Sequence, residues 1–152
     1  MRETTLIKEF QTELYWEGRN GLPSHNIDLN IPGKVSLHLS PDLETGDRLH
    51  SVELFASSIA ASQMLMYVDL CHKNEIVISR YIDRVCVHMN CDASGRMSIG
   101  KILLRPQIYF ISPDNDSLRA RAIHLIHEAK DECLIASMVQ TKIDIEPGFH
   151  YI

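Results

Sequence analysis

The sequence predicts an α+β fold in one domain that spans residues 1–152. Stretches in which apolar and polar residues alternate, as they do in strands, lie on both sides of one long apolar segment of helical character. The predicted order is three strands, a helix, two strands, two helices and a strand, which is not a βαβ repeat. A chain of 152 residues is long enough to bury a real core in one domain.

The first fifty residues read as strands and turns. Apolar and polar residues alternate from Leu6 to Leu14, which predicts a strand. The segment Glu17–Gly21 predicts a turn, because glycine and Asn-Gly tolerate positive φ. Two short strands are predicted around Asn26–Ile31 and Lys34–Leu39, and a loop leads from there to the following helix.

The segment Val52–His72 predicts a long helix with apolar residues nearly all round, which indicates burial on most sides. At 1.5 Å per residue it is roughly 30 Å long, while one domain of this size has a radius of gyration near 15 Å. A small domain has difficulty covering such a helix, so a homodimer that wraps it is expected. Glu53 and Asp69 argue against a membrane span, since each charge near a bilayer centre costs roughly 3 kcal/mol.

The second half of the chain alternates strands and helices. Two long strands are predicted over Ile76–Cys91 and Met97–Ile111, with Pro106 indicating an edge position or a bulge in the second. A helix is predicted from the acidic segment that begins at Ser112. The last predicted elements are a short helical turn over Cys133–Met138 and a strand over Val139–Ile145.

Composition excludes several classes of function. The net charge is −5, and no run of lysine and arginine is present, so a nucleic-acid surface is not expected. The N-terminal residues contain no apolar leader, and a cytoplasmic location without membrane attachment is the expectation. The four cysteines show no zinc-type spacing, and His124 and His127 match no metal motif and are expected to face solvent. Neither a metal nor a cofactor is predicted.

Three local motifs point to one family. The strongest runs from Glu53-Leu54-Phe55 to Ala60-Ala61-Ser62, the second is Cys133-Leu134-Ile135-Ala136-Ser137, and the weakest is Trp16-Glu17-Gly18-Arg19-Asn20-Gly21. In order and separation they resemble the central-helix motif, the second-cysteine motif and the arginine turn of the OsmC/Ohr family of hydroperoxide-reducing proteins. The resemblance implies the OsmC-like fold, with antiparallel sheets around a long buried central helix, in an intertwined homodimer with its active sites at the subunit interface.

The resemblance also implies roles for single residues. Ser62 stands where the family has its peroxide-attacking cysteine, and Cys133 matches the resolving cysteine. Arg19 would be the arginine that favours the thiolate, and Glu53 would hold its guanidinium in a two-pronged ion pair. Arg48, just before the helix, is the alternative arginine.

Ser62 removes the first step of the family's chemistry, because a serine oxygen has no low-cost oxidised form that matches a sulfenic acid. Three hypotheses remain open. The protein binds an apolar or hydroperoxide-like molecule without turning it over, or it is a one-cysteine thiol peroxidase or redox sensor that uses Cys133, or it is a structural homodimer. Hydrolysis by Ser62 is disfavoured, since Gln63 cannot act as its base and no G-x-S-x-G elbow is present. Whether the protein is an enzyme stays open.

Overall fold

The structure is a computed structural model that describes residues 8–16, 27–39, 48–111 and 114–152. It divides into two compact units, Met1–Leu54 and Phe55–Ile152. The predicted single domain over residues 1–152 stays a prediction. Helices combine with antiparallel and parallel strand pairs, so the predicted α+β class is confirmed.

The first unit contains a three-stranded antiparallel sheet in the order β1-β2-β3. Its strands are β1 Glu13–Trp16, β2 Ile27–Ile31 and β3 Val35–Leu39. The turn between β2 and β3 places Gly33 at φ 73°, a conformation that glycine adopts without steric cost. The last two strands agree with the prediction. The first, predicted from Leu6 to Leu14, overlaps β1 only at Glu13 and Leu14, and Leu6 lies outside the described residues. The predicted turn at Glu17–Gly21 lies outside the described residues.

Helix α1 covers Ser51–Lys73, close to the predicted range. One side of the helix is buried, through Ala56, Ile59, Ala60, Gln63, Tyr67, Leu70 and Cys71. The opposite side is more open than expected, because Leu65 is 71% exposed and Val68 40% exposed. By length and composition alone α1 could cross a membrane, a test that the core helices of folded proteins also pass.

The two long strands predicted in the second half are each broken once. The first becomes β4 Ile78–Asp83 and β5 Cys86–Cys91, and the second becomes β6 Met97–Leu104 and β7 Pro106–Phe110. The second break is at Arg105, next to the proline that cannot donate a ladder hydrogen bond. Since β7 lies at the centre of its sheet, Pro106 marks this break and does not mark an edge strand.

The strands of the second unit form two sheets, in the orders β4-β7-β9 and β5-β6-β8. Strand β8 covers Lys142–Ile145, and β9, which the sequence analysis missed, covers Gly148–Tyr151. The β4–β7 and β5–β6 pairs are antiparallel. The β6–β8 and β7–β9 pairs are parallel, so these sheets are mixed and not wholly antiparallel as predicted.

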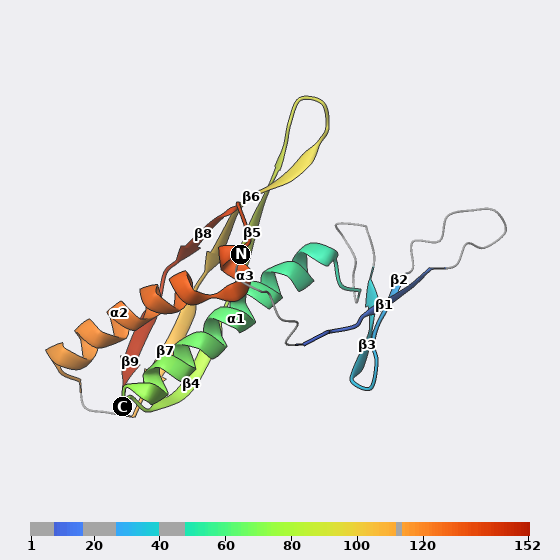
Figure 1. Ribbon diagram of the computed structural model, residues 1–152. Coiled ribbons are helices and arrows are strands. Elements are labelled where there is room, and N and C mark those ends of the chain that lie inside the picture. The colour runs from blue at the N-terminus through green and yellow to red at the C-terminus, as the bar shows by residue number, and fades with distance from the viewer. Residues whose placement is uncertain (1–7, 17–26, 40–47, 112–113) are drawn as a thin grey trace, which may run out of the picture. The chain divides into compact units, whose positions relative to one another are not determined.

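Helices α2 Asp116–Glu132 and α3 Leu134–Ser137 complete the second unit. Helix α2 begins at the N-cap Asn115, whose side chain accepts a hydrogen bond from the Leu118 N–H at 2.8 Å. Asparagine is a favoured N-cap residue for this reason. The acidic start of the helix that the sequence predicts is represented by Asp116 in the first turn. Within the unit, α1 and α2 run side by side over the strands (Figure 1).

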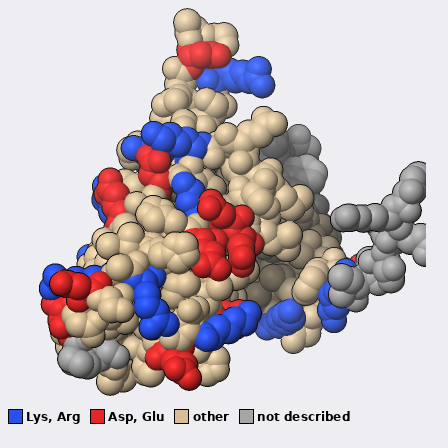
Figure 2. Space-filling model, turned by 60° about the vertical axis from the view of Figure 1, so that its left-hand side comes forward, with Lys and Arg blue, Asp and Glu red and all other residues tan. Residues whose placement is uncertain are grey.

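Two apolar clusters hold the second unit together. The larger joins α1, α2 and the β4-β7-β9 sheet through Tyr67, Ile108, Phe110 and Ile126, which are all fully buried. The smaller joins the first half of α1 to β6 and β8 through Ile59, Ile102 and Leu104 among others, and α3 packs against it. On the face shown in Figure 2, basic and acidic side chains are interspersed. One ion pair of the second unit joins Lys73 and Asp69 on α1 at 2.7 Å.

Candidate site at Ser62 and Cys133

The residues of the second unit that the sequence singled out meet at one point between α1 and α3. Ser62 lies on α1 and is half-buried, while Cys133 lies between α2 and α3 and is fully buried. The Cys133 Sγ donates a hydrogen bond to the Ser62 Oγ across 3.1 Å. The two positions, 71 residues apart in sequence, therefore face each other as the two-motif resemblance implies.

The backbone around Cys133 sets the direction of its side chain. Its φ of −63° and ψ of 113° interrupt the helical conformation between α2 and α3. The Cys133 N–H still bonds the Lys130 carbonyl at 3.4 Å, and the Cys133 carbonyl accepts from the Ser137 N–H at 3.0 Å. The residue is thus held by both helices, and its thiol points into the interior toward α1.

Two buried polar side chains of α1 fix the register between α1 and α2. The Gln63 Nε2 donates to the Ile126 carbonyl at 3.3 Å, and the Tyr67 hydroxyl donates to the Ala122 carbonyl at 3.2 Å. Both side chains are at most 1% exposed. Buried polar groups of this kind are costly unless satisfied, so they favour one arrangement of the helices. From the sequence, Gln63 was considered only as a base for Ser62. Its structural role depends on contacts that only the fold creates.

The pair of one thiol and one hydroxyl limits the available chemistry. A disulfide needs two sulfur atoms about 2.05 Å apart, and here one of the two atoms is oxygen. The thiol is shielded from solvent, and its polar contact is with the neutral hydroxyl of Ser62. The side chains of Ser62 and Cys133 therefore cannot form a disulfide with each other.

Glu53 has a local role at the start of α1 in the first unit. Its Oε2 accepts from the His50 N–H at 2.8 Å, and the His50 Nδ1 accepts from the Val52 N–H at 3.1 Å. This reciprocal pattern is a capping box in which histidine takes the N-cap place. Among the described residues, Glu53 forms no ion pair with Arg48, and Arg19 lies outside the described residues. The proposed arginine cradle therefore stays a prediction.

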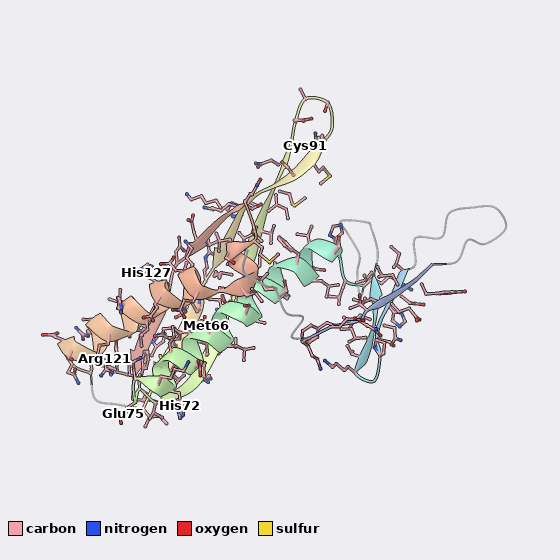
Figure 3. The ribbon with its side chains drawn as sticks, in the orientation of Figure 1. Met66, His72, Glu75, Cys91, Arg121 and His127 are labelled. Carbon is pink, nitrogen blue, oxygen red and sulfur yellow. The ribbon has the colours of Figure 1, made fainter. Side chains whose placement is uncertain are left out.

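The other candidates lie away from this pair. Cys71 is fully buried in the larger cluster, and desolvation raises the pKa of its thiol from 9.0 to about 11. His124 and His127 are exposed on α2, with the His124 Nε2 3.5 Å from the Glu128 Oε2, and Figure 3 locates His127 on that helix. In the part of the chain that the structure describes, no group of three or more histidine, cysteine or acidic residues is placed to hold a metal.

Comparison with known families decides the assignment. A family model described as OsmC-like protein matches residues 44–147. The chain belongs to the OsmC-like protein family. This confirms the family that the three sequence motifs predicted. No curated protein matches the chain.

Solved structures of OsmC-like proteins share the fold. An OsmC-like protein of unknown function from Vibrio cholerae superposes with a TM-score of 0.79 at 19% identity, over 93% of this chain and 99% of that one. An organic hydroperoxide resistance protein from Elizabethkingia anophelis gives 0.66 at 14% identity, over 97% and 100%. The organic hydroperoxide resistance protein OhrB of Bacillus subtilis gives 0.60 at 16% identity, over 92% and 98%. At such identities the likeness shows the fold alone.

Proposed function

We propose that this OsmC-like protein lacks ordinary two-cysteine peroxidase activity and acts as a pocket-binding, stress-related protein. The observation that carries the proposal is the 3.1 Å contact between Cys133 Sγ and Ser62 Oγ. It supports the view that the two family cysteine positions are Ser62 and Cys133, of which only the second carries sulfur. Without a sulfur at position 62, no sulfenic acid forms there and no disulfide resolves it.

The alternative function, a one-cysteine peroxidase or redox sensor at Cys133, is less well supported. Reactive thiols are accessible and lie beside positive charge, whereas Cys133 is fully buried and bonded to a neutral hydroxyl. The residues that precede it, Asp131 and Glu132, are acidic. These surroundings match those of a packing cysteine better than those of a nucleophile.

The proposal includes a homodimer with an apolar or hydroperoxide-like small molecule at its interface, in the cytoplasm. It is supported by large apolar side chains that are exposed close in sequence to the pair. Leu65, three residues after Ser62, is 71% exposed, and Leu134, which follows Cys133, is 70% exposed. Such side chains gain most from a partner or ligand that removes them from water. The arginine of this site, Arg19 or Arg48, would bind the polar end of the molecule.

The substitution Ser62→Cys tests the proposal. A cysteine at this position places a second sulfur opposite Cys133, so we expect a disulfide on oxidation and measurable reduction of cumene hydroperoxide with dihydrolipoamide. Mass spectrometry of the oxidised protein detects the cross-link as a loss of two hydrogen atoms. The substitution Ser58→Cys, one turn earlier on an exposed position of the same helix, is the matched control and should give neither result.

The double substitution Ser62→Cys with Cys133→Ala separates the attack on the hydroperoxide from the formation of the disulfide. It keeps the attacking sulfur and removes the resolving one, so one equivalent of hydroperoxide is consumed without a cross-link. A folded Ser62→Cys variant that neither forms the disulfide with Cys133 nor gains turnover would overturn the proposed site.

A further inference from the structure

An open pocket is lined by the end of α2, the short helix α3 and strand β8, whose places in the second unit can be followed in Figure 1. Its volume is about 460 Å³, which is within the range of pockets that bind small molecules. Neither Ser62 nor Cys133 lines it, so it is separate from the candidate site. The wall between α3 and β8 is well packed, because Ala136 contacts the apolar cluster that contains Ile143.

The carboxylate on the β8 wall of the pocket is already neutralised. The Asp144 Oδ2 lies 3.4 Å from the Lys142 Nζ and 3.8 Å from the Lys101 Nζ. Two ammonium groups thus share one carboxylate, and the three groups together carry one net positive charge. This wall therefore favours the negative end of a ligand.

The α2 wall carries one charge of each sign that the fold itself does not use. Within the described residues, the side chains of Lys130 and Asp131 form neither an ion pair nor a hydrogen bond. Lys130 is half-buried, and a cation that is partly removed from water gains from a negative partner. Asp131 is exposed, so its carboxylate is open to a donor. The half-buried hydroxyl of Thr141, also in the lining, has no side-chain partner in the described ranges.

The pocket lining also contains three aliphatic side chains, those of Ala136, Val139 and Ile143. A small apolar group bound against them is removed from water, which is favourable. The lining thus calls for a ligand with a carboxylate, an ammonium group and a short aliphatic part. An aliphatic α-amino acid has all three, whereas a fatty acid leaves Asp131 without a partner and an alkyl amine leaves Lys130 without one.

We propose that the pocket between α2, α3 and β8 binds an aliphatic α-amino acid. The Lys130 ammonium group pairs with the carboxylate of the ligand, and the Thr141 hydroxyl donates a hydrogen bond to it. The Asp131 carboxylate accepts from the ammonium group of the ligand. Val139 and Ile143 contact its side chain. Binding here does not depend on the chemistry of the Ser62–Cys133 pair.

Titration of the intact, isotope-labelled protein with L-leucine at neutral pH tests the proposal, followed by two-dimensional NMR of the backbone amides. We expect shifts at residues 130–144 and a Kd of about 1 mM or below. Isocaproate, which lacks the ammonium group, and isoamylamine, which lacks the carboxylate, should each bind about tenfold more weakly, because a hydrogen bond between charged groups is lost. Equal affinity for L-leucine and either analogue, or no shifts around the pocket, overturns the proposal.

Two substitutions assign each charge of the ligand to its residue. Lys130→Gln should weaken L-leucine binding about tenfold and leave isoamylamine binding unchanged, since that amine has no carboxylate to lose. Asp131→Asn should likewise weaken L-leucine and leave isocaproate unchanged. Glu132→Gln removes the next acid of α2, which does not line the pocket, and is the matched control with unaltered affinity. Undiminished L-leucine binding in folded Lys130→Gln and Asp131→Asn contradicts the assignment, and the three ligands decide on the unaltered protein alone if a variant does not fold.

Discussion

Serine and cysteine differ in one side-chain atom, which is oxygen in serine and sulfur in cysteine. The chemical consequences of that atom depend on its neighbours. Ser62 accepts a hydrogen bond from a buried thiol at 3.1 Å, and its oxygen has no low-cost oxidised form that matches a sulfenic acid. At Cys86 the neighbour is the guanidinium group of Arg105, whose Nη1 lies 3.6 Å from the sulfur. The contrast shows why a cysteine's function is read from its surroundings and not from its presence in a sequence.

Cys71 leads to a prediction about stability at alkaline pH. Desolvation raises the pKa of its thiol from 9.0 to about 11 in the folded protein. Because the folded pKa is higher than the unfolded one, the stabilisation is fully present below pH 9 and is lost as the pH rises toward 11. We expect ionisation of the Cys71 thiol to lower the free energy of unfolding by about 2 kcal/mol between pH 8 and pH 11. Urea unfolding at a series of pH values measures this change.

Variants isolate that contribution from the other groups that titrate in the same range. Cys71→Ala lowers stability at pH 8 by removing buried atoms, but its decline with rising pH should be shallower than that of the unaltered protein. Cys91→Ala removes an exposed thiol and should leave the decline unchanged. Identical pH slopes for Cys71→Ala and the unaltered chain would contradict the assignment.

At the scale of elements, periodicity and local motifs predicted much of the fold. The range of α1 and the strands β2 and β3 followed from apolar patterns and turn residues. The breaks at residues 84–85 and at Arg105 could not be predicted from these patterns. They depend on how neighbouring strands bend together and on contacts such as that between Asp83 and Arg105. Strand β9 is only four residues long, which is too short to show a recognisable alternation of apolar and polar residues.

The candidate site was predictable only where a motif marked it. Ser62 and Cys133 were found because each lies in a short run with a family resemblance. Cys86 on β5 and Arg105, between β6 and β7, are in contact although 19 residues apart, a separation that corresponds to no motif. Their contact arises from the fold alone.

The end of α1 provides a prediction at this scale. Glu75 has φ 59°, in the left-handed region. The Ile76 N–H bonds the Cys71 carbonyl at 2.9 Å and the Glu75 N–H bonds the His72 carbonyl at 3.0 Å. This is a Schellman motif, in which glycine usually takes the left-handed place.

Glu75→Gly should therefore raise the unfolding free energy by about 0.5–1 kcal/mol, since it removes the steric cost of the side chain in this conformation. Urea unfolding at neutral pH measures the change. Glu75→Gln keeps the side chain's size and should stay within about 0.5 kcal/mol of the original. A loss of stability in Glu75→Gly would show that the side chain contributes more than its backbone strain costs.

At the scale of the whole molecule, the predicted homodimer would cover the open side of α1. Leu65 and Val68 on this helix are 71% and 40% exposed, although the helix was expected to be buried on most sides. A second copy of the chain that covers them would restore the predicted burial. Because the same helix carries Ser62, such a partner would also shape the surroundings of the candidate site.

Sedimentation equilibrium tests the dimer. We expect the mass of two chains for the unaltered protein and a shift toward the monomer for Leu65→Glu, because a buried unpaired carboxylate is costly. Ile123→Glu introduces the same charge at an exposed apolar position of α2 and should leave the mass unchanged. A monomeric unaltered protein at micromolar concentration would contradict this prediction.

The rate at which the chain itself turns over an organic hydroperoxide tests the central claim most directly. Cumene hydroperoxide loss is followed in the unaltered protein with dihydrolipoamide as reductant. We predict no turnover above that of reductant alone, because oxygen replaces sulfur opposite Cys133. Sustained turnover at an enzyme-like rate would show that Ser62 and Cys133 do not form a redox-silent pair.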